Sequence, residues 1–249
     1  MYRAARDDPE HRYPAAALLA ALLMAVLAAG PAVRASATAV APAVVELFTS
    51  EGCSSCPPAE AVLGSLASRP DVLALAYHVT YWDSAAWRDL FGRHEAVSLQ
   101  HHYVRTLRLP SAYTPQGVVN GTLDVLGSNE QGIEQAIQQL PRPALVIGKR
   151  SHAAWVIHLP ALAADCPCTL RWVSVRAAAQ VNVHGGENAG WTLREYRVVR
   201  SMQTAGSWDG SESERTLPLE GVPSDATSVV VLAESRQDAS IVAVGEMAL

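Results

Sequence analysis

Two cysteines separated by two serines, Cys53 and Cys56 in the run GCSSCPP, are the residues of this sequence best suited to chemistry. If a helix begins here, the two sulfurs lie one turn apart on the same helix face, which permits a reversible disulfide. Unpaired backbone N–H groups and the positive end of the helix dipole favour a thiolate at a helix N-terminus. The sequence therefore predicts a dithiol–disulfide centre with Cys53 as the nucleophile.

Three other interpretations of this cysteine pair remain open. A structural zinc site needs two further ligands, and the remaining cysteines, Cys166 and Cys168, lie far along the chain. A static disulfide would need no further residue. A copper site would combine the two thiolates with a histidine, of which His78 is the first candidate, because soft ligands suit copper.

Thr114 and Pro115 are the next candidates, because they immediately precede an expected strand. A cis bond between them would set the backbone of Thr114 against the disulfide, and proline is the residue at which cis bonds occur. A proline beside the two thiols also offers no side-chain ligand atom to a metal ion that the thiols could otherwise bind. An ordinary trans turn is the alternative.

Tyr81, Trp82 and Asp83 form a candidate substrate-binding rim, since they follow an expected strand. The alternative is structural: Trp82 covers the core edge and Asp83 caps the next helix. An acid close to Cys53 raises the pKa of the thiol, so Asp83 would oppose the helix dipole there. Glu51, just before the motif, is a candidate proton carrier.

The elements that position these residues begin with a buried strand at 44–49, a helix at 59–68 and a second apolar strand at 71–80. A strand–helix–strand unit of this kind has parallel strands. Their carboxyl ends meet at one edge of the sheet, where the cysteine turn and the Tyr81–Asp83 turn both fall. The next elements are expected in the order helix, strand, strand, helix, at residues 84–109, 117–120, 122–126 and 128–140.

Beyond Pro143 the pattern changes to short alternating runs separated by turn residues, which is typical of an antiparallel sandwich or small barrel. We therefore expect an α/β domain over residues 43–140 and an all-β, sandwich-like domain over residues 142–249. For Cys166 and Cys168, two free thiols or a loop staple are favoured over an electron relay.

The N-terminus and the overall charge bear on location and partners. Residues 13–29 are apolar and precede a small-x-small pattern, which predicts a signal peptide over residues 1–37; a retained membrane anchor is the alternative. The expected location is periplasmic or secreted, without stable membrane insertion after cleavage. The net charge of −5 and the lack of a Lys/Arg cluster argue against a nucleic-acid partner.

Several runs, ELFTSEGCSSCPPAE, HVTYWD, YTPQGVVNG and GENAGWTL, resemble the secreted bacterial family catalogued as domain of unknown function 1223. Residues 43–140 also look like the thioredoxin fold, a mixed sheet flanked by helices. This resemblance implies that Cys53 attacks, Cys56 resolves and Pro115 is a cis-proline. The Ser-Ser dipeptide and the lack of a confident buried acid depart from the thioredoxin pattern, which leaves the redox direction open.

The leading expectation is an exported thiol–disulfide oxidoreductase that acts on protein thiols or disulfides and needs no dissociable cofactor. Two alternatives stand beside it. One is a binding protein on a thioredoxin scaffold without redox turnover, and the other is a periplasmic copper-handling protein.

Overall fold

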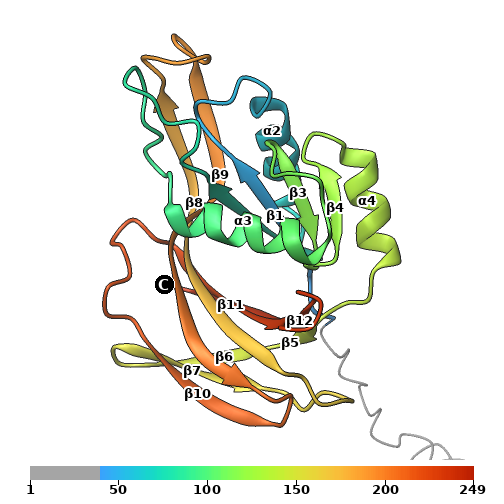
Figure 1. Cartoon of the computed structure of the whole chain (residues 1–249). Helices are drawn as coiled ribbons and strands as arrows, with labels where there is room; N and C mark the ends of the chain where they lie inside the picture. The colour runs from blue at the N-terminus through green and yellow to red at the C-terminus, as the bar shows by residue number, and fades with distance from the viewer. Residues whose placement is uncertain (1–39) are drawn as a thin grey trace, which may run out of the picture. The chain divides into compact units, whose positions relative to one another are not determined.

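Strands outweigh helices in the computed structural model, which describes residues 40–249 (Figure 1). The predicted signal peptide, residues 1–37, lies outside the described residues. In chain order the elements are β1 (Ala43–Thr49), α2 (Pro57–Leu66), β2 (Val72–His78), α3 (His94–Thr106), β3 (Gln116–Val119), β4 (Leu123–Leu126), α4 (Glu130–Gln139), β5 (Ala144–Leu145), β6 (Ile147–Ser151), β7 (Ala154–Leu159), β8 (Cys168–Asn182), β9 (Thr192–Trp208), β10 (Ser213–Pro218), β11 (Ser228–Ser235) and β12 (Ile241–Ala248). Within residues 40–249 no helix is both long and apolar enough to cross a membrane.

Strands β1 and β2 pair in parallel, as predicted, with Ala43 opposite Val72. Every residue of both strands is buried, because helices cover both faces, and this explains their continuous apolar sequence. On one face the core joins β1 to α2 and α4; on the other, Phe48 packs with Tyr103 of α3. The predicted β3–β4 hairpin is confirmed, and its turn residues Asn120 and Gly121 have positive φ.

The predicted thioredoxin-like α/β fold is wrong. The edge of β2 that does not pair with β1 pairs in parallel with β9, with Ala76 opposite Val198, so the sheet extends beyond β2. The result is a curled mixed sheet of nine strands in the order β4-β3-β1-β2-β9-β8-β11-β12-β5, with three short helices in the described part of the chain. The reason is the length of β8 and β9, which span 15 and 17 residues and reach from the later segment to the edge of β2.

The helix predicted over residues 84–109 is confirmed only in its later part, since α3 begins at His94 and the stretch before it is a loop. Side chains bind the backbone here in place of helical hydrogen bonds. The Ser84 hydroxyl accepts from the N–H groups of Ala86 and Trp87 at 3.2 and 3.3 Å. Serine and aspartate offer the backbone this alternative to a helix.

The last hundred residues fold as strands, with β10, β7 and β6 forming a second, three-stranded sheet. Apolar side chains of this sheet, including Trp155 and Leu217, pack with Leu170 of β8 and Val231 of β11. Cys166 and Cys168 form a disulfide at the start of β8. The boundary between two domains near residue 141 stays a prediction, although one sheet takes strands from both sides of it.

A buried ion pair links the two parts of the chain. Glu46 of β1 is fully buried, and its Oε1 lies 3.0 Å from Nη2 of Arg171 on β8. The hydroxyl of Tyr103 donates to the other carboxylate oxygen. Removing a charge from water is costly unless it is paired and hydrogen-bonded, so Glu46 depends on a partner 125 positions away in sequence.

Candidate functional site

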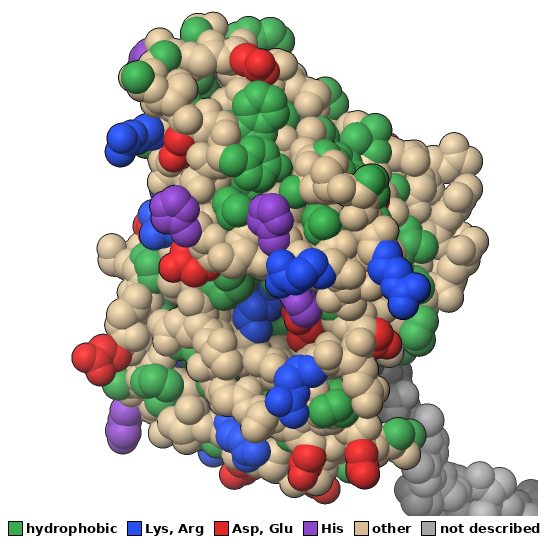
Figure 2. Space-filling model, in the orientation of Figure 1, with side chains coloured by type: hydrophobic (Ala, Val, Ile, Leu, Met, Phe, Trp, Pro, Cys, Tyr) green, Lys and Arg blue, Asp and Glu red, His purple; other side chains and the backbone are tan. Residues whose placement is uncertain are grey.

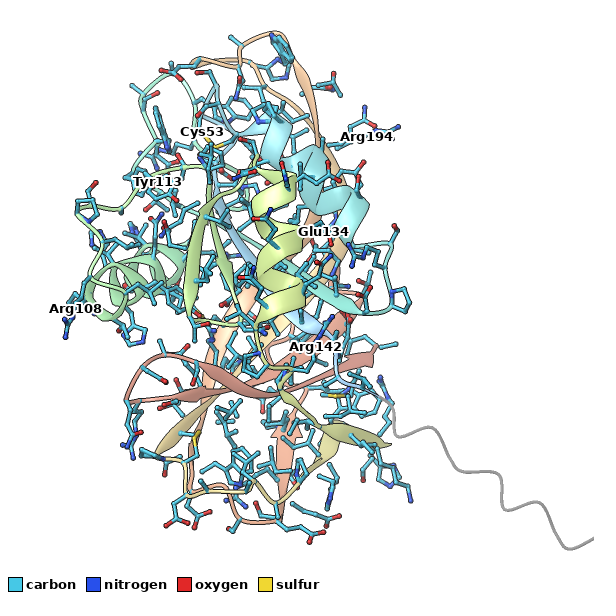
Figure 3. The ribbon with its side chains drawn as sticks, turned by 90° about the vertical axis from the view of Figure 1, so that its right-hand side faces the viewer. Cys53, Arg108, Tyr113, Glu134, Arg142 and Arg194 are labelled. Atoms are coloured by element: carbon cyan, nitrogen blue, oxygen red, sulfur yellow. A yellow bond between two sulfur atoms is a disulfide. The ribbon has the colours of Figure 1, made fainter. Side chains whose placement is uncertain are left out.

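The cysteine pair lies in the turn between β1 and α2. Cys53 and Cys56 form a disulfide, while Ser54 and Ser55 between them are exposed. Two backbone hydrogen bonds shape the turn: the N–H of Cys53 donates to Ser50 O and the N–H of Cys56 to Cys53 O, both at 3.1 Å. The disulfide therefore lies just beyond the carboxyl end of β1, at one edge of the sheet (Figure 3).

Helix α2 begins after the motif, with Cys56 as its N-cap and prolines in its first two positions. Pro57 and Pro58 have no N–H, and the next two N–H groups, of Ala59 and Glu60, donate to Cys56 O. Few backbone donors are thus left for a thiolate. Two hydroxyls lie at Cys53 instead: Thr114 Oγ1 is 3.3 Å and Ser55 Oγ 3.4 Å from its Sγ.

The peptide bond between Thr114 and Pro115 is cis, as predicted. Thr114 is held from both sides, because Trp82 Nε1 donates to its hydroxyl at 2.8 Å and that hydroxyl in turn donates to Cys53 Sγ. Trp82, Thr114 and Cys53 thus form one hydrogen-bonded chain, although they come from three separate segments.

The other two residues of the expected rim have different surroundings. Tyr81 is 45% exposed beside Trp82, with the ring centroids 6.4 Å apart. Asp83 does not cap α3; its Oδ1 accepts from the N–H of Asp89 at 3.1 Å and stabilises the loop. Of the three, Trp82 is the one that reaches the cysteine site through a hydrogen bond.

Both cysteines are nonetheless shielded, with Cys53 0% and Cys56 1% exposed. The hairpin that joins β8 and β9 turns at the same end of the sheet (Figures 1 and 3) and is bonded to the backbone of the cysteine turn. The buried side chain of Asn188 donates through Nδ2 to the carbonyls of Glu51 and Cys53, at 2.9 and 3.0 Å. Glu187 accepts from the N–H of Ser54 at 3.1 Å.

One cavity reaches the disulfide from the side. It has a volume of about 290 Å³ and lies between α2 and β9, with Cys56, Glu60 and Glu195 among its lining residues. Figure 2 shows one outer face of the molecule, on which acidic, basic and histidine side chains are interspersed.

Glu51, the predicted proton carrier, lies directly behind the turn. Its Oε2 accepts from Trp87 Nε1 at 2.9 Å and from the N–H of Leu90 at 3.2 Å. Burial, and then the charge of Asp89, raise the pKa of Glu51 to about 7. A carboxyl group with such a pKa can hold or release a proton near neutral pH.

Sequence reasoning missed two buried acids in the same region, Glu60 of α2 and Glu195 of β9. They lie with His78, the last residue of β2, and the three side chains each offer a ligand atom within 4.8 Å of the others. A signal for Glu60 was present, because it precedes Leu63 by three positions and so shares the apolar face of α2. Glu195 comes from a strand that local sequence does not place here.

Two solved structures resemble this chain. The crystal structure of protein AGR_C_4864 from Agrobacterium tumefaciens has a TM-score of 0.73 and 28% identity, covering 84% of this chain and 94% of that one. The structure of HBP35 of Porphyromonas gingivalis has a TM-score of 0.56 and 15% identity, covering 84% of this chain and 76% of that one, and this likeness shows the fold alone. No curated protein matches the chain. A model of the family described as "Protein of unknown function (DUF1223)" matches residues 44–234, so the chain belongs to that family.

Proposed function

We propose that this protein is an exported thiol–disulfide oxidoreductase whose redox centre is the Cys53–Cys56 pair. The observation that carries this proposal is the hydrogen bond from the Thr114 hydroxyl to Cys53 Sγ, at 3.3 Å, which joins the disulfide to a segment 61 positions away in sequence. The proposal of export depends on the apolar segment and the cleavage pattern in residues 1–37.

In the reduced protein, the thiolate of Cys53 attacks one sulfur of a partner disulfide. The partner's S–S bond breaks, a mixed disulfide forms, and the other partner sulfur leaves as a thiolate that takes a proton. The thiolate of Cys56 then attacks Cys53 Sγ, which restores the disulfide seen here and releases the second partner thiol. The partner gains two electrons and the cysteine pair loses two; run in reverse, the same steps oxidise a dithiol.

Cys53 is the better nucleophile of the two because donors lie at its sulfur. Hydroxyls of Thr114 and Ser55 within 3.3 and 3.4 Å can stabilise a negative charge on Sγ. No comparable hydrogen bond to Cys56 Sγ is present among residues 40–249. In the reduced protein we therefore expect the pKa of Cys53 to lie well below the ordinary thiol value of about 8.5.

The test combines thiol titration with trapping. Alkylation rates of the reduced protein against pH give the pKa of Cys53, and Cys56→Ser should accumulate a mixed disulfide with a small protein disulfide such as insulin, because the resolving thiol is gone. Cys53→Ser should accumulate none. As a matched control, Cys166→Ser and Cys168→Ser are added to Cys56→Ser, and they should leave the amount of mixed disulfide unchanged. A Cys53 pKa at or above about 8.5, with no trapping by Cys56→Ser, would overturn the proposal.

A second candidate function is a binding protein in which this disulfide is only structural. The burial of both cysteines favours it. The loop that the bond closes is short, with a sequence separation of 3, so the chain-entropy gain is only about 2 kcal/mol. A pair that stays oxidised in glutathione buffers and a reduced form that loses ligand binding would support this second function.

A further inference from the structure

Three buried polar side chains face one another behind the disulfide. Glu60 comes from the first turn of α2, His78 from the end of β2 and Glu195 from β9. Their exposed fractions are 6%, 1% and 2%. One nitrogen of His78 and one carboxylate oxygen from each glutamate all lie within 4.8 Å of one another.

The histidine is held in an orientation that leaves one nitrogen free. Its Nδ1 lies 2.9 Å from Asp89 Oδ2, so this side of the ring is engaged. Its Nε2 has no hydrogen-bond partner, and the nearest acid oxygen, Glu195 Oε2, is 3.8 Å away, too far for a hydrogen bond. Neither oxygen of Glu60, nor Oε2 of Glu195, has a partner in full hydrogen-bond geometry, although the Thr49 hydroxyl and the N–H of Tyr196 lie close enough to Glu60 to favour its ionised form.

The cluster carries an excess of acid. Within residues 40–249 no lysine or arginine comes within ion-pair distance of Glu60 or Glu195; the one basic group near them is His78. Burial raises the pKa of Glu60, and burial together with Glu60 raises the pKa of Glu195 to about 8. Burial opposes protonation of His78, but the charge of Asp89, and then those of Glu195 and Glu60, raise the pKa of His78 to about 10, so its imidazolium offsets one of the acids. The remaining buried carboxylate charge needs further protons, or a cation that displaces the proton from His78 Nε2.

We propose that Glu60, His78 and Glu195 bind a divalent transition-metal ion, for which Zn²⁺ is the best match. One imidazole nitrogen and two carboxylate oxygens are ligands that zinc accepts, and a three-ligand set leaves a coordination position open. Calcium and magnesium prefer oxygen alone, and copper(I) prefers sulfur. Asp89 fills the outer shell, because a metal-bound histidine usually gives its other nitrogen to a carboxylate.

The spacing of the ligands suits such an ion after a small movement. Zinc bonds of about 2.0–2.1 Å in a tetrahedron put neighbouring ligand atoms about 3.4 Å apart. The 3.8 Å between His78 Nε2 and Glu195 Oε2 therefore needs to shorten by a few tenths of an ångström. Glu60, whose ligand atom lies within 4.8 Å of the other two, must move further toward the ion. Glu60 and Glu195 also line the cavity of about 290 Å³, which gives the ion a route and the open position a space.

A neighbouring set, Glu51, His78 and Asp89, is less suitable although its ligand atoms also lie within 4.8 Å of one another. Asp89 Oδ2 accepts from the N–H of Glu51 at 2.8 Å and Oδ1 from the N–H of Phe91 at 2.8 Å, while both oxygens face His78. The Asp89 oxygens are therefore occupied by well-formed hydrogen bonds, whereas no contact of the Glu60 oxygens meets full hydrogen-bond geometry. The metal site is therefore placed on the Nε2 side of His78.

The test is zinc binding by the full chain with both disulfides kept oxidised, so that no thiolate competes. After treatment with a chelator, equilibrium dialysis against zinc chloride should load one Zn²⁺ per chain and raise the unfolding temperature. Glu60→Gln and Glu195→Gln should each weaken binding by about 100-fold or more, and Asp89→Asn by about 10–100-fold. The control Glu220→Gln changes an exposed acid and should bind as the wild type does.

Two measurements keep the outcome independent of variant folding and of the redox proposal. X-ray absorption of the zinc-loaded wild type should show nitrogen and oxygen ligands at about 2.0–2.1 Å with one imidazole, and no sulfur near 2.3 Å. Cys53→Ser with Cys56→Ser should bind zinc as tightly as the wild type, whether or not the cysteine pair turns over. Absence of stoichiometric zinc, a sulfur ligand, or full binding by folded Glu60→Gln and Glu195→Gln would overturn the proposal.

Discussion

Replacing Asn188 with alanine should uncover the Cys53–Cys56 disulfide. The side chain of Asn188 is 4% exposed, and its Nδ2 donates to the carbonyls of Glu51 and Cys53 at 2.9 and 3.0 Å. These bonds fasten the tip of the β8–β9 hairpin over the turn. A hydrogen bond contributes about 0.5–1.5 kcal/mol net, so the two together stabilise the closed hairpin by about 1–3 kcal/mol.

If a reductant reaches the disulfide through an opened hairpin, its rate follows the population of the open state. A loss of about 1–3 kcal/mol raises that population, and hence the rate, by about 5- to 150-fold. The assay is reduction by excess dithiothreitol, quenched with an alkylating agent and read by mass spectrometry at the peptide containing Cys53. Urea unfolding of each variant checks that global stability is retained.

The matched control is Asn182→Ala in the same hairpin. Asn182 is exposed, and its Oδ1 accepts from the Thr192 hydroxyl at 2.7 Å without contact to the cysteine turn. It should leave the reduction rate within about 2-fold of the wild type, because surface changes cost little. An unchanged rate in Asn188→Ala would refute the reasoning and point to entry through the cavity beside Cys56. Equal acceleration in both variants would mean general loosening of the hairpin.

Three further predictions concern stability. Arg171→Met should lower the free energy of urea unfolding by about 3–5 kcal/mol, because it leaves the buried Glu46 carboxylate without its ion-pair partner. Adding Glu46→Gln should restore part of this loss. Strictly additive losses of stability in the double variant would contradict the pairing. Because the pKa of Glu51 rises from 4.5 to about 7 on folding, the folded state binds more protons between these values, so this group destabilises the protein as the pH rises through that window. Glu51→Gln should flatten that part of the stability profile relative to the wild type, and parallel profiles would argue against it. Gly64→Ala would place a Cβ 2.7 Å from the ring of Tyr196 and should cost about 1–3 kcal/mol in calorimetric unfolding, while an unchanged unfolding temperature would show that the ring can move away.

The segment around the cysteines was predictable because its signals are local. Continuous apolar runs gave β1 and β2, and two prolines in succession placed the start of α2 just behind the motif. The Asn120-Gly121 dipeptide gave the β3–β4 turn for the same reason, since both residues tolerate positive φ. In each case neighbouring residues decide the conformation without help from distant segments.

The fold class was not predictable in the same way, because it depends on which strand lies at the edge of β2. Alternation along residues 168–208 indicates strands, but it does not say that β9 pairs with β2 through Ala76 and Val198. Nor does it reveal that the hairpin tip returns to the cysteines through Asn188. These contacts join segments more than a hundred residues apart, and local propensity carries no information about such pairing.

Local sequence shows that two acids are buried, but only the tertiary structure shows what neutralises them. Glu46 lies in an apolar strand and Glu60 on the apolar face of α2, so both positions predict a buried charge that needs a partner. The fold supplies that partner for Glu46, as Arg171 and the hydroxyl of Tyr103. For Glu60 it supplies a second acid, Glu195, and one histidine nitrogen without a hydrogen bond. Arg171 therefore meets the demand within the chain in the first case, whereas in the second the imidazolium of His78, with its pKa raised to about 10 chiefly by Asp89 against the effect of burial, offsets only one of the acids, and the rest calls for protons or a cation.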